Sequence, residues 1–360
     1  MNEITPAWCS NGVSRSLRLA LAIGAICSCW ISHPARADSD YELGHGYNVG
    51  PFNFAGYSEL AIGLPDEGSK KVAVEDLSLF ITGHINKLLN PFVEAELTHL
   101  DFSHSGPPDA DRGDGTLVLE RLYDDVELSD SFTLRLGKML APVGAWNEIH
   151  AAPLVLTTIR PAVTFRNFSE YLTGASLNYA DPNGESPSVQ VYWQPDREFS
   201  ERPSTITFNQ YKMVEGLHIT APLSLLDQIG FSFQRSRDAE NVNQSLFGLD
   251  FKYTIEQLTL QGEATYTFLS NGTSKDQHHP HQGELGAYLA GSYALGERWS
   301  VYSWYEEFAG RDDASASRDL LAGVAFHPYP AMVIKAEYLQ NIGGPSVNPT
   351  GLFVSWSILF

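Results

Sequence analysis

Cysteine is nearly absent from this 360-residue sequence, and its 3 copies, Cys9, Cys27 and Cys29, all lie near the amino end. Neither Cys27 nor Cys29 sits in a convincing lipoprotein site. A chain that carries no thiol beyond residue 29 cannot rest on disulfide bonds. It must depend on an extensive set of hydrogen bonds instead.

Long hydrophobic runs are missing as well. The mean hydropathy of −0.17 excludes a helical membrane protein, but it permits either a soluble all-β protein or a membrane barrel. In a membrane barrel, the apolar lipid-facing residues and the polar lumen-facing residues offset one another in the mean hydropathy. The uncharged run at 19–31 is too short for a spanning helix.

The amino-terminal segment is typical of a secretory signal peptide. Arg15 and Arg18 precede the uncharged run, and Ala35-Arg36-Ala37 follows it as a small-residue cleavage site. We therefore expect residues 1–37 to be removed and the mature chain to begin near Asp38.

Basic residues are scarce, with 23 Lys and Arg against 43 Asp and Glu. Without the leader, 20 basic and 42 acidic residues remain, a net charge of −22. This excess argues against nucleic acid as a partner and favours cations, if the acids line a confined space. An acidic surface is also a common means of staying soluble.

The chain instead contains segments in which apolar and polar residues alternate with a period of two. In 258–268, Leu258, Leu260, Tyr266 and Phe268 share one face, while Thr, Gln and Glu occupy the other. We expect residues 38–51 to be loosely structured and about 16 strands to follow within 52–360. Their predicted positions are 52–63, 72–85, 90–103, 116–129, 132–140, 169–180, 186–194, 209–220, 226–236, 243–254, 257–269, 283–294, 298–309, 318–327, 331–341 and 351–360.

The lengths of the connections favour one architecture. Connections after the even strands are brief, whereas those after odd strands include 104–115, 141–168, 195–208 and 270–282. This sorting predicts an all-β fold, a transmembrane antiparallel up-and-down β-barrel. Asp124 and Glu215 fall on otherwise apolar strand faces, which indicates either bulges or an error of one residue in register.

The final strand, 351–360, is expected to close the barrel. It is about long enough to cross a bilayer core, and pairing with the first strand would remove its unpaired edge. The alternative is an edge strand of a soluble sandwich. The residues that share its apolar face are Leu352, Val354, Trp356, Ile358 and Phe360.

A barrel of this width leaves an aqueous channel unless something folds into it. Segment 141–168 is too apolar for an exposed loop, so we expect it to fold inward and narrow the pore. The alternative is an outer cap or a contact between subunits. Its polar residues facing the pore would be Asn147, Glu148, His150, Arg160 and Arg166.

Alternation also predicts charged residues on the wall of this constriction. Acidic and basic side chains facing one another would create a transverse field that filters solutes. The alternative is that they pair and only brace the wall. The predicted wall residues are Glu94, Glu96, Arg121, Asp125, Glu127 and Arg135.

Enzyme and metal signals are weak. Gly-x-Ser-x-Gly, HExxH and phosphate-binding glycine loops do not occur, so we expect no enzymatic activity and no cofactor. His278, His279 and His281 form a weak metal-binding tract without a spaced fourth ligand.

The stretch 134–144, Leu-Arg-Leu-Gly-Lys-Met-Leu-Ala-Pro-Val-Gly, follows the 120–123 strand and resembles a hairpin of bacterial porins, particularly the phosphate-selective porin-like group. The resemblance implies a passive channel in outer-membrane lipid, a homotrimer, and a third outer loop that narrows the lumen. It also implies that the barrel-assembly machinery acts through the last strand. No ladder of Lys and Arg is present, so anion selectivity is not carried over.

The leading hypothesis is thus an outer-membrane porin for small hydrophilic solutes or ions with a mild cation preference. The alternative is a surface receptor or adhesin with an occluded barrel.

Overall fold

The computed structural model describes residues 41–105, 113–201, 210–270, 283–311 and 315–360. The expected signal peptide, 1–37, and the tract of His278, His279 and His281 lie outside the described residues. None of the helices formed by the described part is long and apolar enough to cross a membrane.

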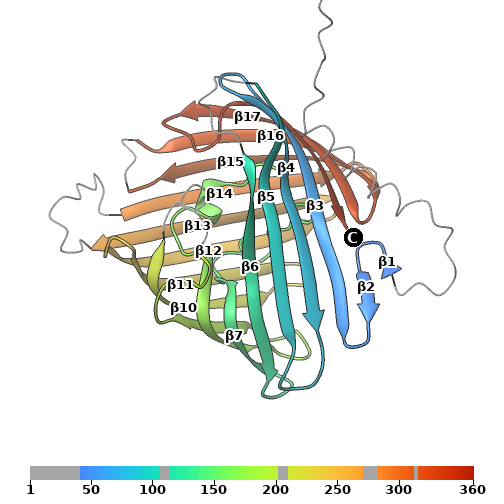
Figure 1. Ribbon diagram of the computed structural model, residues 1–360. Helices are drawn as coiled ribbons and strands as arrows, with labels where there is room; N and C mark the ends of the chain where they lie inside the picture. The colour runs from blue at the N-terminus through green and yellow to red at the C-terminus, as the bar shows by residue number, and fades with distance from the viewer. Residues whose placement is uncertain (1–40, 106–112, 202–209, 271–282, 312–314) are drawn as a thin grey trace, which may run out of the picture. The chain divides into compact units, whose positions relative to one another are not determined.

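Sixteen of the described strands form a closed ring in which each strand pairs antiparallel with the next (Figure 1). The ring closes where β18 pairs with β3, from Leu359 opposite Tyr57 to Gly351 opposite Pro65. The predicted sixteen-stranded antiparallel barrel is confirmed. Its strands are β3 (Phe52–Pro65), β4 (Lys70–Gly83), β5 (Pro91–Ser105), β6 (Asp114–Glu127), β7 (Phe132–Leu140), β8 (Tyr171–Tyr179), β9 (Ser188–Gln194), β10 (Tyr211–Pro222), β11 (Gln228–Asp238), β12 (Asn243–Ile255), β13 (Leu258–Ser270), β14 (Gly283–Ala294), β15 (Trp299–Ala309), β16 (Ser317–Tyr329), β17 (Met332–Gly343) and β18 (Gly351–Leu359).

Three short elements complete the described secondary structure. These are β1 (Tyr41–Glu42), β2 (Gly46–Val49) and the 3-10 helix η1 (Ala162–Thr164). β1 and β2 form a small hairpin, and β2 pairs with the start of β3. Residues 41–49, for which we expected no regular structure, thus extend the sheet beyond the ring.

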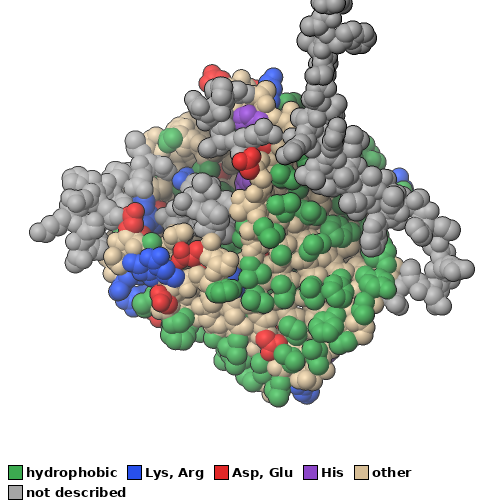
Figure 2. Space-filling model, viewed as in Figure 1, with side chains coloured by type: hydrophobic (Ala, Val, Ile, Leu, Met, Phe, Trp, Pro, Cys, Tyr) green, Lys and Arg blue, Asp and Glu red, His purple; other side chains and the backbone are tan. Residues whose placement is uncertain are grey.

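Side chains alternate between the two faces of the wall. On β13, Tyr266 and Phe268 are exposed on the outer face, whereas Glu263 and Thr265 are buried toward the lumen. Hydrophobic side chains gather over β3 to β6 in Figure 2. An apolar exterior around a polar interior is the pattern of a barrel in lipid.

β6 and β10, the two strands in which a charged residue interrupts the predicted apolar face, are both part of the ring. β6 carries a bulge in which Glu120 is the extra residue, because Glu94 faces Arg121 and the next pair joins Ala95 to Leu119. On β10, Glu215 remains on the exposed face, where its carboxylate lies 3.8 Å from Arg235 of β11.

The longest connections between strands lie at one end of the barrel, although 66–69 and 239–242 at that end have only four residues each. Those after even-numbered strands are short, for example 256–257 and 330–331, and we refer to this end as the short-connection rim. Connections after odd-numbered strands form the long-connection rim and include 195–210. The longest of them joins β7 to β8 and is named here the lumen loop, residues 141–170.

Candidate functional site

The lumen loop is fixed to the inner face of the barrel from its first residues onward (Figure 1). The backbone N–H of Gly144 donates to Ser232 Oγ of β11 at 3.1 Å, and that of Trp146 donates to Glu263 Oε1 of β13 at 2.8 Å. Gly144 has φ +68°, and a Cβ there would lie 2.1 Å from a carboxylate oxygen of Glu263. The close approach therefore requires glycine.

Two further buried glutamates hold the loop in the same way. Glu306 of β15 accepts the backbone N–H of Val163 at 2.8 Å. Glu337 of β17 accepts those of Thr158, at 3.1 Å, and Ile159, at 2.6 Å. Three alternate strands thus each offer a carboxylate to backbone N–H groups that have no strand partner, which satisfies groups that are costly to bury alone.

The middle of the loop is tied to β17 and β18 as well. Lys335 Nζ donates to the carbonyl oxygens of Ala152, at 2.8 Å, and Val155, at 2.7 Å. The hydroxyls of Thr158 and Ser355 lie 2.7 Å apart. Wall side chains therefore satisfy both donors and acceptors of a non-repetitive backbone inside the lumen.

Arg160 braces the loop internally. Its Nη1 donates to Glu170 Oε1 and its Nη2 to Asn147 Oδ1, each at 3.0 Å, and its Nε donates to Thr164 Oγ1 at 2.8 Å. The loop therefore holds its own shape across the lumen, because one guanidinium joins its beginning, middle and end.

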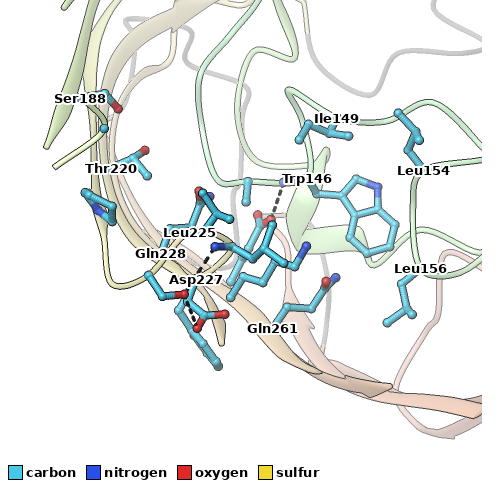
Figure 3. A pocket seen from close by; sticks show the side chains of 18 of the residues that line it. Trp146, Ile149, Leu154, Leu156, Ser188, Thr220, Leu225, Asp227, Gln228 and Gln261 are labelled. Atoms are coloured by element: carbon cyan, nitrogen blue, oxygen red, sulfur yellow. Dashed lines mark hydrogen bonds between the residues drawn. The ribbon is translucent and has the colours of Figure 1, made fainter. Parts of the chain in front are cut away.

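A small cavity lies beside the loop, between two larger ones. The larger cavity toward the short-connection rim has a volume of about 510 Å³, and the one toward the long-connection rim about 420 Å³. In Figure 3, Trp146 and Leu154 of the loop face the first of these, with Thr220 and Gln261 on the wall.

The small cavity, of about 180 Å³, is named here the acidic strait. It shares Trp146 and Val155 with one larger cavity, and Thr158 and Arg160 with the other. Three neighbouring strands supply its acidic side. Its lining is Glu59, Asp76, Glu96, Thr98 and His99 from the wall, and Trp146, His150, Ala152, Val155, Thr157, Thr158 and Arg160 from the loop.

Solved structures of similar fold are outer-membrane channels. OmpF of Salmonella typhi in complex with daunomycin matches with a TM-score of 0.62 at 12% identity, covering 86% of this chain and 97% of that one. The anion-selective porin of Comamonas acidovorans gives 0.57 at 12%, covering 86% and 98%. The outer membrane channel DcaP of Acinetobacter baumannii gives 0.59 at 10%, covering 88% and 100%.

The fold is that of a porin. At these identities the likeness concerns the fold alone. No family model matches the chain. An uncharacterized protein of Aquifex aeolicus (strain VF5) is 30% identical over 149 residues, 41% of this chain and 32% of that protein. The match thus spans about a third of the length of this curated relative.

Within this porin fold, four of the predicted charged residues form two ion pairs. Arg121 Nε donates to Glu94, and its guanidinium lies 4.5 Å from the centre of the Phe92 ring. Arg135 donates to both carboxylate oxygens of Asp125 at 2.8 Å. Such pairs brace the wall, which is the alternative that the sequence left open.

Apart from Glu148, which is described below, the remaining predicted residues lie in three places. Glu96, His150 and Arg160 line the acidic strait. Arg166 lies with its guanidinium 5.4 Å from the centre of the Phe308 ring on β15. Glu127 is at the short-connection rim, where its backbone N–H donates to the carbonyl oxygen of Lys87, and it lies outside the strait.

One cluster joins predicted residues of the wall and the loop. Glu94, Glu96 and His150 each have a potential metal-ligating atom, and these atoms lie within 4.8 Å of one another. Glu94 and Glu96 come from β5, and His150 comes from the lumen loop. The sequence assigned all three to the pore but did not indicate that they meet.

Sequence reasoning missed two of the strait's acids, Glu59 and Asp76. Alternation could have identified Glu59. Leu60 and Ile62 lie on one face of the first barrel strand, which places Glu59 on the opposite face, toward the lumen. Asp76 was hidden by a bulge on β4 in which Glu75 is the extra residue, because Glu59 faces Asp76 and Leu60 faces Val74. Alternation placed Lys335 and Glu337 on the polar face, but nothing linked them to the loop.

Glu148 of the lumen loop accepts a hydrogen bond from Gln190 Nε2 at 3.0 Å. Burial raises the pKa of Glu148 above its ordinary value of 4.5, while Gln190 and the charge of Arg135 act in the opposite direction. The folded chain therefore holds this proton more tightly than the unfolded chain does. The free energy of unfolding should consequently fall as pH rises from 4.5 through the raised pKa.

A Glu148→Gln variant does not titrate in this range. We expect its Tm, measured relative to the wild type on the refolded barrel, to increase as the pH is raised from below 4.5 to 7. If the Tm of the variant minus that of the wild type stays constant or decreases over this range, burial does not raise the pKa of Glu148.

Proposed function

We propose that this protein is an outer-membrane porin, a passive diffusion channel for small hydrophilic solutes or ions with a mild cation preference. The observation that carries the proposal is the acidic strait, which lies between a wider cavity at each rim. A wide barrel narrowed by one inward loop is a means of setting which solutes pass.

The lining of the strait favours cations. Glu59, Asp76 and Glu96 approach from the wall, while Arg160 opposite them is bound to the carboxylate of Glu170. Carboxylates around a narrow aqueous space raise the local concentration of cations, because low-dielectric walls focus the field. The single guanidinium keeps the preference mild and gives the strait a transverse field.

Location and assembly form part of the proposal. The outer face of the barrel is apolar, which suits a lipid bilayer (Figure 2). Export through a cleaved signal peptide and insertion by the barrel-assembly machinery would place it in the outer membrane. A trimer form is described for OmpT of Vibrio cholerae, which has a TM-score of 0.58 at 13% identity. A homotrimer is proposed here on that likeness and on the resemblance to the phosphate-selective porin-like group.

A specific observation favours the alternative of a receptor or adhesin with an occluded barrel. The lumen loop contacts both sides of the lumen, since Glu148 reaches Gln190 of β9 while Thr158 reaches Ser355 of β18. If the strait does not pass hydrated solutes, the loop acts as a plug.

Planar-bilayer recording on the purified, refolded chain separates the two functions. We expect discrete open-channel steps and, in a KCl gradient, a reversal potential of the sign that indicates cation preference. Bilayers that remain silent although the barrel is folded and inserted would support the occluded receptor. A reversal potential of the opposite sign would overturn the cation preference alone.

A further inference from the structure

We propose that Glu94, Glu96 and His150 form a binding site for a divalent transition-metal ion of the zinc type, between the wall and the lumen loop. The site is distinct from the tract of His278, His279 and His281, which the sequence singled out. It does not depend on whether the barrel conducts.

The geometry is close to that of a three-ligand site. One potential ligand atom from each residue lies within 4.8 Å of the other two. Ligand atoms about 2 Å from a zinc ion lie within about 4 Å of one another. Side-chain movements that bring the ligand atoms about 1 Å closer together would therefore close the site. Glu94 and Glu96 stand two residues apart on β5, so both carboxylates point to the same face of the strand.

A separate observation points to a cation at this place. The Glu94 side chain is 0% exposed, and among the described residues its Oε1 has no hydrogen-bond partner. Its Oε2 accepts the hydrogen bond from Arg121 Nε. A buried carboxylate oxygen without a partner is costly and rare. A metal ion bound by Oε1 would satisfy it.

The donor set selects the class of metal. Two carboxylate oxygens and one imidazole nitrogen suit zinc and its neighbours, whereas magnesium and calcium prefer sites made of oxygen alone. Three protein ligands leave one position of a tetrahedral zinc for water. Glu96 and His150 both line the acidic strait, which has room for that water.

The bound metal would also join two parts of the chain. The loop is held to β13, β15 and β17 by Glu263, Glu306 and Glu337, and the metal would tie its His150 to β5 as well. If the channel proposed above exists, this additional attachment lies in the strait and reduces the current. This consequence, unlike the metal site itself, rests on the proposed function.

Equilibrium dialysis of the refolded full chain against Zn²⁺, with bound metal measured by atomic emission, tests the site. The experiment uses a background carrying His278→Asn, His279→Asn and His281→Asn, so that the histidine tract makes no contribution. We expect one zinc ion per chain. His150→Gln should weaken binding roughly tenfold or more, since a direct ligand is lost.

Two further variants make the result decisive. Glu96→Gln should also weaken zinc binding, whereas His84→Gln should not, because His84 is an exposed histidine beside the short-connection rim. Circular dichroism and heat-modified gel migration show whether each variant is folded. Undiminished zinc binding in folded His150→Gln, or equal competition by Mg²⁺, would overturn the site.

A bilayer recording separates this inference from the proposed function. Zinc should lower the conductance of the background chain and leave that of its His150→Gln derivative unchanged. If the bilayers are silent before zinc is added, the channel proposal fails, and the dialysis result still decides the metal site.

Discussion

Replacing Glu337 by alanine should detach the part of the lumen loop that lines the acidic strait and raise the single-channel conductance. The carboxylate accepts the backbone N–H groups of Thr158 and Ile159. A hydrogen bond to a charged group contributes about 1.5–3 kcal/mol. Loss of both should therefore cost about 3 kcal/mol and raise the detached population roughly a hundredfold.

The measurement is single-channel conductance together with its open-state noise, and two variants serve as controls. Glu337→Gln retains an oxygen acceptor and should change the current less than alanine does. Glu306→Ala removes a carboxylate that accepts the backbone N–H of Val163. This is the same kind of hydrogen bond, but Val163 does not line the strait. If Glu306→Ala raises the conductance as much as Glu337→Ala, the strait does not limit the current.

Neutralising the strait should abolish the cation preference. In the triple variant Glu59→Gln, Asp76→Asn and Glu96→Gln, three carboxylates that line the acidic strait are neutralised. A charge about 4 Å from a permeating ion contributes about 1 kcal/mol in water, roughly a fivefold factor in relative occupancy. We expect the ratio of cation to anion permeability to fall several-fold, because Arg160 then remains in the lining.

The control removes the same number of charges from the short-connection rim. Asp130→Asn, Glu185→Gln and Glu297→Gln are all exposed turn substitutions outside the strait. Reversal potentials in a KCl gradient compare the two triple variants. An equal shift in both would show that net charge, rather than the strait, sets the selectivity.

The barrel could be predicted from the sequence because its signals are local. Alternation within each strand, as in 258–268, depends only on residues two apart, and each short connection can be read between adjacent strands. The closing strand was found for the same reason, since Leu352, Val354 and Trp356 alternate with polar Ser355 and Ser357. Bulges, such as the one at Glu120, disturb the alternation only within single strands.

The attachment of the loop could not be predicted because its partners are remote. Trp146 and Glu263 are 117 residues apart, Val163 and Glu306 143, and Thr158 and Glu337 179. The sequence pattern of a polar residue on the lumen face does not distinguish contact with water from contact with a backbone N–H. The position of the loop is therefore decided by three-dimensional packing that no pattern within a strand contains.

The cluster of Glu94, Glu96 and His150 shows the same limit. Alternation placed the two glutamates on the lumen face, and the apolar character of 141–168 favoured an inward loop for His150. Their approach depends on how far the loop crosses the lumen. Composition drew attention to the tract of His278, His279 and His281 instead, because adjacent histidines are visible without a fold.

The hydroxyl contact between Thr158 and Ser355 has a consequence for biogenesis. Ser355 belongs to the strand that completes the ring, and Thr158 belongs to the segment that lies inside it. The Thr158–Ser355 contact can form only when β18 is present, because Ser355 lies on that strand. The final attachment of the loop to this part of the wall therefore belongs to the same stage of assembly as the pairing of β18 with β3.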